Sequence, residues 1–349
     1  MKLYLAPLLA TALLAGFTAA NVRAQSAADA HVAAAKAAVA PKTAGPAWHS
    51  FDYSFRQQCA KPRENAQPEA VGPNVPLEKG EAAKLVPTPF EKWYTPPVKV
   101  FDNLYYMGTK TESTWALTTS EGIILLNTNF DWVTTSLIQE LRMVGLDPAT
   151  IKYAVITHAH SDQAWGINTL KNLVPGVRVI MSEGDWNTLA NDNTPARLKP
   201  VKDMVATDGQ KLTLGDTTIT LYITPGSSPG TMSLIIPLKD GNQMHVGSLI
   251  GGTTTNVVRG GLQYFPDAPT MLKTYVASAA RFHQIEDQAG VDTIVSVHAS
   301  LDMMFAKADA LKSRPPGQPH PFVSKDDVDR LSTVLTECAQ AKLAWATNQ

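Results

Sequence analysis

The chain has 349 residues, of which 44% are hydrophobic and 17% are charged, so it can bury a substantial core and lacks the composition of a disordered protein. Its 30 basic and 31 acidic residues nearly balance, and no basic run or basic patch with interleaved aromatic residues occurs. This pattern argues against a nucleic-acid-binding surface. We therefore expect one large domain whose partner is a small-molecule substrate and not a nucleic acid.

Residues 1–24 have the pattern of a signal peptide. Lys2 precedes an apolar run that extends to Phe17, and small residues lead to Ala24. An uncleaved membrane anchor is the alternative, but Pro7 and the small residues before Ala24 favour cleavage. We expect the mature protein to be periplasmic or secreted, monomeric, and without stable membrane association.

Residues 25–93 are expected to form an N-terminal extension, and residues 94–349 a single domain. The segment 25–47 is rich in alanine, which predicts a tether or a frayed helix. Prolines recur from Lys61 to Pro97, which predicts an extended arm lying over the core.

The chain has two cysteines, Cys59 and Cys338. Neither has the CxxC spacing of a zinc site. In an oxidising compartment, two cysteines outside any metal motif are better interpreted as a disulfide than as free thiols. This bridge would join the N-terminal extension to the last helix.

The rest of the chain alternates between strand and helix patterns. In the first half we expect strands at 98–107, 113–118, 122–127, 152–157 and 177–181, and helices at 133–144 and 165–173. In the second half we expect strands at 211–214, 217–223, 231–237, 243–248 and 292–297, and helices at 267–285 and 325–344. Periodicity alone therefore predicts a mixed α and β protein.

The residues most directly linked to chemistry follow the apolar run 153–156. His158, His160 and Asp162 alternate with other residues at the end of this predicted strand. Residues i and i+2 of a strand share a face, so both imidazoles can reach one ion where the sheet ends. A single histidine is often structural, but two at this spacing followed by an aspartate indicate a metal site.

These residues resemble the His-x-His-x-Asp-His signature of the metallo-β-lactamase superfamily, with Gln163 in place of the last histidine. The resemblance extends from Tyr94 to the C-terminus. The family's Thr-Pro-Gly-His-Thr-Pro-Gly turn corresponds to residues 224–230, where Ser227 replaces the histidine. Asn127 likewise replaces a usual aspartate.

Two further positions extend the resemblance. Ser248 lies where most of the superfamily has a metal-bridging aspartate, and a serine there is typical of the third subclass of class B β-lactamases. His298 matches the last family ligand. The resemblance implies an α/β fold, the αββα four-layer sandwich, with its site at one edge.

The resemblance also implies a function, namely hydrolysis of a β-lactam or a related cyclic amide or ester by a metal-bound hydroxide, with one or two zinc ions. His158 and His160 would bind the first ion. Asp162 would act as the catalytic carboxylate and join His298 at the second ion. Weak ligands or pocket-lining residues would be Gln163, Ser227 and Ser248.

The two substitutions leave alternatives open, because a hydroxyl and an amide oxygen are poorer zinc donors than imidazole. One alternative is a binding protein with a degraded metal site that does not turn its ligand over. Another is a metallohydrolase that acts on a different substrate, such as a lactonase. A hydrolase is favoured because three imidazoles and the carboxylate are retained.

Other conspicuous residues have structural interpretations. Asp185 and Glu183 resemble a helix start. Trp165 could border the pocket because it follows the ligand loop, the segment 158–162 that carries the candidate metal ligands. His245 should face away from Ser248 and be structural. Four histidines lack partners at ligand spacing: His31, His49, His283 and His320. Two glycine pairs are expected in flexible pocket-edge segments: Gly251-Gly252 and Gly260-Gly261.

Overall fold

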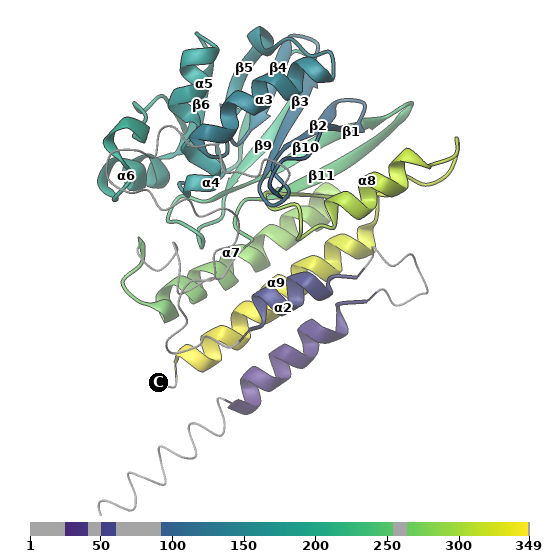
Figure 1. Ribbon diagram of the computed structural model, residues 1–349. Helices are drawn as coiled ribbons and strands as arrows, with labels where there is room; N and C mark the ends of the chain where they lie inside the picture. Colours follow the sequence, from purple (N-terminus) through teal and green to yellow (C-terminus); the bar gives the residue numbers. More distant parts are fainter. Residues whose placement is uncertain (1–24, 41–49, 61–91, 254–263, 348–349) are drawn as a thin grey trace, which may run out of the picture.

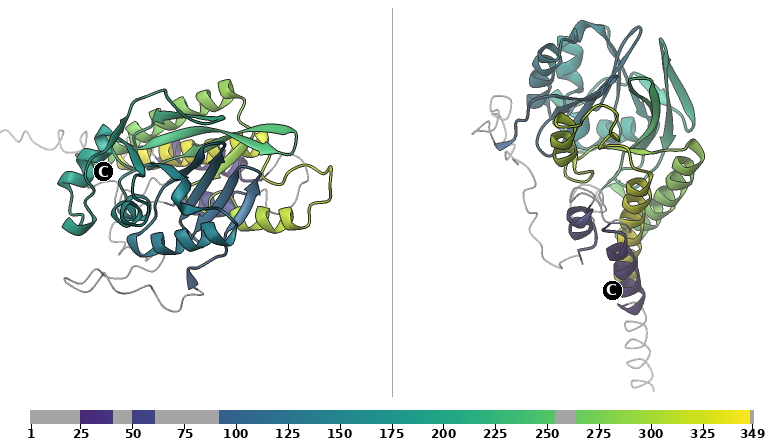
Figure 2. Two further views of the ribbon diagram at one scale, coloured as in Figure 1. Left: turned by 90° about the horizontal axis from the view of Figure 1, so that it is seen from above. Right: turned by 90° about the vertical axis from the view of Figure 1, so that its right-hand side faces the viewer.

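The computed structural model describes residues 25–40, 50–60, 92–253 and 264–347 (Figure 1). The expected signal peptide, most of the proline-rich arm, His49 and Gly260-Gly261 therefore lie outside the described residues. The described chain forms two β-sheets packed face to face, with helices on both outer sides (Figure 2). This is the αββα sandwich that the sequence resemblance implied.

The first sheet has seven strands in the order β1 to β7. Their bounds are Val98–Phe101, Leu104–Gly108, Ser113–Thr119, Gly122–Leu126, Ile151–Val155, Arg178–Ser182 and Met204–Ala206. Strands β1 to β4 are antiparallel, whereas β4 to β7 pair in parallel. The parallel strands end at one edge of the sheet, so the loops that follow them lie close together.

The second sheet has five strands in the order β12-β11-β10-β9-β8. From β8 to β12 the bounds are Gln210–Leu214, Thr217–Ile223, Met232–Asp240, Gln243–Ile250 and Thr293–Ser296. Strand β12 pairs in parallel with β11, and Ser248 lies opposite Ile294. The loops after β11 and β12 therefore leave the sheet at the same edge.

Alternation along the strands divides the apolar side chains between two sides of each sheet. In β4, Ile124 and Leu126 point into the core between the sheets, while Ile123 and Leu125 pack under the helices of the first sheet. These strands are apolar on both faces because both faces are covered. An apolar layer between each sheet and its outer helices therefore separates the central core from solvent.

Helices α3 (Asp131–Met143), α5 (Ile167–Leu173) and α6 (Glu183–Asn191) cover the first sheet, and α7 (Ala268–Ala289) and α9 (Lys325–Ala346) cover the second (Figures 1 and 2). Helix α7 begins where the Asp267 side chain accepts a hydrogen bond from the Thr270 amide, and ends at Gly290, whose φ of 68° is left-handed. The shorter helical segments are α2 (Asp52–Gln58), η3 (Pro148–Thr150), α4 (Ser161–Ala164), η4 (Ala196–Leu198) and α8 (Met304–Lys312).

Several sequence expectations were wrong in detail. The strand expected at 98–107 is a hairpin, because Asp102 and Asn103 turn the chain between β1 and β2. The strand expected at 152–157 ends at Val155. Strand β7 and helix α8 were not expected, because each is short and lacks a clear apolar period.

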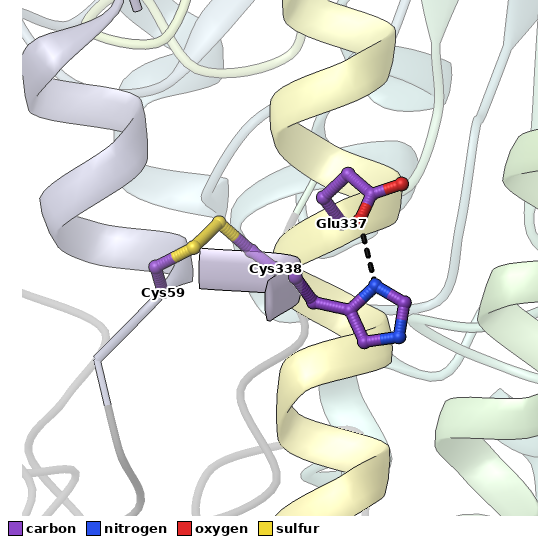
Figure 3. The surroundings of a disulfide bond; sticks show 4 residues. Cys59, Glu337 and Cys338 are labelled. Atoms are coloured by element: carbon purple, nitrogen blue, oxygen red, sulfur yellow. Dashed lines mark hydrogen bonds and ion pairs between the residues drawn. A yellow bond between two sulfur atoms is a disulfide. The ribbon is translucent and has the colours of Figure 1, made fainter. Parts of the chain in front are cut away.

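The N-terminal extension is not a free tether where it is described. Residues 25–37 are helical, and Ala35 is buried together with Phe51 of the extension against the apolar face of α9. His31 pairs with Glu337 at 2.7 Å, and Cys59 and Cys338 form the expected disulfide (Figure 3). The extension therefore forms an additional layer on α9.

Candidate metal centre

The candidate site lies at the edge where both sheets present the ends of their strands. The β5–α4 loop carries His158 and His160, and Asp162 lies in the first turn of α4. The β9–β10 loop carries Ser227, and His298 follows β12 two residues after its end. Residues far apart in the sequence thus meet because both sheets end here.

The two histidines of the ligand loop face each other. His158 Nε2 and His160 Nδ1 are 3.1 Å apart, and donor atoms of His158, His160 and Asp162 all lie within 4.8 Å of one another. Both histidines lie beyond the end of β5, so the loop and not the strand sets their orientation. The convergence of two ring nitrogens and a carboxylate oxygen is the arrangement that holds a divalent metal ion.

Asp162 links this group to the second sheet. Its Oδ2 atom lies 3.1 Å from His298 Nε2 and accepts a hydrogen bond of 2.8 Å from Gln163 Nε2. His298 Nδ1 lies 3.0 Å from the Thr253 hydroxyl. All the expected strong donors, His158, His160, Asp162 and His298, are therefore brought to one place.

The protonation states favour metal binding. Burial, followed by the neighbouring His160, holds the pKa of His158 well below its ordinary value, and burial also lowers the pKa of His160. Burial alone would raise the pKa of Asp162, but the hydrogen bond from His298 and the surrounding imidazoles bring it below its usual range. His158 and His160 are thus held neutral beside an ionised Asp162. Burial alone would lower the pKa of His298, but its hydrogen bond to Asp162 raises it.

Two buried acceptors near this group have no protein partner among the described residues. They are His160 Nε2 and Gln163 Oε1. An unsatisfied polar atom in the interior is costly, so Gln163 Oε1 has the capacity to bind an ion or a water. His160 Nε2 has the capacity to bond a water, because the other ring nitrogen, Nδ1, faces His158. Ser227 is buried beside the same group, with its hydroxyl 2.8 Å from the position of a Cβ on Gly252. The donor set fits a zinc ion, with fewer strong donors than the family pattern.

Ser248 does not line this pocket, contrary to the sequence expectation. Its hydroxyl donates a hydrogen bond of 2.6 Å to Glu286 of α7, on the outer side of the second sheet. The alternation of β11 explains the difference, because Leu249 points into the core between the sheets and Ser248 points to the helices.

Residues without ligand character support the ligand loop. Asn127 has φ of 65°, and its Oδ1 accepts hydrogen bonds from the amide and the hydroxyl of Thr157. The Thr157 hydroxyl in turn lies 3.1 Å from His158 Nδ1. The substituted Asn127 thus takes part in orienting the first histidine, a role that the sequence did not reveal.

The glycine pair after β11 is tightly packed and does not form a flexible edge. A Cβ on Gly251 would lie 1.6 Å from the Met232 carbonyl oxygen. The backbone must therefore pass close to β10 at this point, which only glycine permits. Trp165 is partly exposed at the end of α4.

Three of the four histidines expected to lack partners at ligand spacing make polar contacts in the structure. His31 pairs with Glu337, and His320 donates to or accepts from backbone atoms of Val100 and Phe322. His283 lies in a second group of possible ligands with Asp287 and Asp329. In that group Lys325 already contacts both carboxylates, at 2.6 and 2.5 Å. Glu337 and Asp329 lie on α9, far along the chain from their partners, whereas Asp287 lies on α7 together with His283. His245 is structural as expected, and its Nδ1 lies 2.7 Å from Asp292.

The comparisons with known proteins agree with this geometry. The model of the metallo-β-lactamase superfamily matches residues 108–281. The subclass B3 metallo-β-lactamase BJP-1 of Bradyrhizobium japonicum superposes with a TM-score of 0.62 and 27% identity, over 74% of this chain and 97% of that one. A metallo-β-lactamase of Cronobacter sakazakii with a HARLDQ motif has a TM-score of 0.57 and 28% identity, over 74% and 90%. The chain belongs to the metallo-β-lactamase superfamily and resembles its subclass B3.

A curated relative adds no activity. The uncharacterised protein YobT of Bacillus subtilis (strain 168) is 29% identical over 136 residues, which are 36% of this chain. The match spans 54% of that relative. The activity of the whole chain is therefore a matter for proposal.

Proposed function

We propose that the protein is a metal-dependent hydrolase that opens a β-lactam or a related cyclic amide or ester. The observation that carries the proposal is the convergence of His158, His160 and Asp162 within 4.8 Å, with His298 3.1 Å from the carboxylate. These residues would hold one zinc ion, and a second where Gln163 or water completes the donor set. A zinc ion bound here supplies a Lewis acid and lowers the pKa of water to about 7.

The protein residues then have separate tasks. His158 and His160 would hold the ion through the nitrogens that face each other, Nε2 and Nδ1. Asp162, ionised and hydrogen-bonded to His298, would accept a hydrogen bond from the attacking water and set its direction. Thr157 and Asn127 fix the ring of His158.

The substrate class is inferred from likeness. The Cronobacter sakazakii enzyme has a HARLDQ motif, and this chain reads His-Ala-His-Ser-Asp-Gln over residues 158–163. Both sequences end in Asp-Gln, so a glutamine at this position occurs in a protein described as a metallo-β-lactamase. This likeness favours the hydrolase over a ligand-binding protein without turnover, and favours a β-lactam over a lactone.

We also propose that the mature protein acts in the periplasm or outside the cell, as a monomer. The disulfide between Cys59 and Cys338 supports an oxidising compartment. Within the described ranges, no helix is both long enough and apolar enough to span a membrane.

The test combines metal analysis with an activity assay on the purified mature protein. We expect one to two zinc ions per chain and hydrolysis of a chromogenic β-lactam, both lost in His160→Ala. Gln163→Ala should retain more zinc, because an amide oxygen is a weak donor. Zinc without lactam turnover, but with lactone hydrolysis, would replace the β-lactam by a lactone. Absence of zinc from the natural chain would refute the metallohydrolase.

A further inference from the structure

Asp185, in the first turn of α6, is a buried carboxylate that belongs to none of the expected ligand positions. Its Oδ2 accepts hydrogen bonds from the Ala159 amide, at 3.1 Å, and from the Ser228 hydroxyl, at 2.7 Å. Its Oδ1 accepts one from the Gly230 amide, at 3.0 Å. Ala159 lies between the two metal-binding histidines, and Ser228 follows Ser227. One side chain of α6, the helix that follows β6, therefore joins the loops of both sheets.

The surroundings of Gly230 make this junction rigid. Its carbonyl oxygen accepts a hydrogen bond of 2.6 Å from Ser182, which also caps α6. A Cβ on Gly230 would lie 2.0 Å from Ser182 Oγ and 2.4 Å from the Asp185 amide nitrogen. The β9–β10 loop is thus held in direct backbone contact with the start of α6.

We propose that Asp185 is a positioning residue that couples the His158–Asp162 loop to the 224–230 loop and so sets the geometry of the metal donors. The coupling of the two loops rests on the three hydrogen bonds. Its effect on metal binding rests on the proposed function. Because the carboxylate fixes the amide between His158 and His160, its loss lets the two ring nitrogens move apart. Groups that orient ligands in this way affect metal affinity by about 10–100-fold.

The substitution Asp185→Asn tests the coupling with little change of shape. The asparagine amide has only one oxygen. Its NH₂ group would therefore face at least one of the three groups that donate hydrogen bonds to the natural carboxylate. We expect the zinc dissociation constant, measured by competition with a chromophoric chelator, to rise by about 10–100-fold. We expect hydrogen exchange of the Ala159 and Gly230 amides, followed by NMR in the metal-free protein, to become faster.

Asp203→Asn is the matched control. Asp203 is also a largely buried carboxylate that accepts a backbone hydrogen bond, from Val179 at 3.0 Å, but it lies at the opposite end of β6. Its loss should leave zinc affinity and the two amides unchanged. Ser228→Ala removes one of the three hydrogen bonds and should weaken zinc binding less than Asp185→Asn does. If Asp185→Asn does not fold, Ser228→Ala still tests whether this coupling affects zinc binding.

Two outcomes would overturn the inference: unchanged zinc affinity and amide exchange in Asp185→Asn, or equal weakening by Asp203→Asn. Failure of the proposed function would look different. If the natural chain bound no zinc, amide exchange would still decide the coupling, with faster exchange at both Ala159 and Gly230 supporting it and no change refuting it. Absence of β-lactam turnover bears only on the substrate.

Discussion

At the residue scale, the site departs from the family pattern at two ligand positions. In both, the residue of this chain is a poorer zinc donor than the histidine it replaces. Gln163 is fully buried, donates to Asp162 through Nε2 and leaves Oε1 without a protein partner among the described residues. Ser227 is buried against Gly252, where a hydroxyl replaces an imidazole. The side chains that remain form one compact set, so the two substitutions do not disperse the candidate site.

The variant Ser227→His with Gln163→His should restore much of the metal affinity. Imidazole is a stronger zinc donor than a hydroxyl or an amide, and both positions border the existing donors. Recovery should be partial, because Ser227 has little room beside Gly252. We expect about two zinc ions per chain and faster β-lactam hydrolysis. If zinc content rises without any lactam turnover, the pocket is shaped for another substrate.

His320 gives a second prediction at this scale. Its ring is stacked on Phe101, with centroids 4.1 Å apart, and burial lowers its pKa from 6.5 to about 4. The folded state therefore favours the neutral ring, and the associated stability is complete above pH 6.5 and lost as pH falls toward 4. Between about pH 7.5 and pH 4.5 the loss should reach roughly 2–3 kcal/mol.

Urea unfolding at both pH values measures this contribution. His320→Gln cannot titrate but keeps a donor for the Val100 carbonyl oxygen and an acceptor for the Phe322 amide. Its free energy of unfolding should fall less between the two pH values than that of the natural chain. An equal fall in both proteins would assign the acid sensitivity to other groups.

At the element scale, helix α2 connects the N-terminal extension to the loop of His298. Ser54 is buried, and its hydroxyl donates a hydrogen bond of 2.9 Å to the carbonyl oxygen of Leu301. The disulfide at the end of α2 holds this helix against α9 (Figure 3). The extension therefore braces one of the ligand loops although it lies outside the two sheets.

Removal of the disulfide tests the contribution of this packing. Cys59→Ser with Cys338→Ser should lower the free energy of unfolding by about 2–5 kcal/mol, because the bridge closes a long loop between residues separated by 279 positions. Ser54→Ala should cost only about 1 kcal/mol, the loss of one hydrogen bond. Denaturant unfolding measures both effects. Two thiols that react with an alkylating agent before reduction would show that no disulfide forms.

At the scale of the whole molecule, the candidate site draws its donors from both sheets. His158, His160 and Asp162 follow the first sheet, whereas His298 and Ser227 follow strands of the second. An ion bound to both groups would connect the two halves of the sandwich across their shared edge. Metal binding should therefore be linked to global stability.

Zinc removal should destabilise the folded protein. At free zinc about 100 times the dissociation constant, binding to the folded state contributes about 2.7 kcal/mol. Excess EDTA should shift the urea midpoint downward by the corresponding amount. His160→Ala should respond much less to zinc or to EDTA, and an unchanged midpoint in the natural chain would contradict a site that joins the sheets.

The sequence by itself determined the local parts of this protein. The spacing of His158, His160 and Asp162 after an apolar run predicted that their side chains converge, although the loop after β5 and not the strand itself brings them together. The alternation of apolar residues likewise predicted most strands. The two cysteines could be paired because no other cysteine was available.

Only the tertiary structure decided the rest. The sequence indicated that Asp185 was an ordinary helix start. Its hydrogen bond with Ser228 of the β9–β10 loop is visible only in the structure, because the two residues are 43 positions apart in the chain. Ser248 was assigned to the pocket, but the register of β11 turns it toward Glu286. Such contacts depend on which strands are neighbours and on which face of the sheet each side chain lies. The pattern of residues along the sequence does not fully specify either.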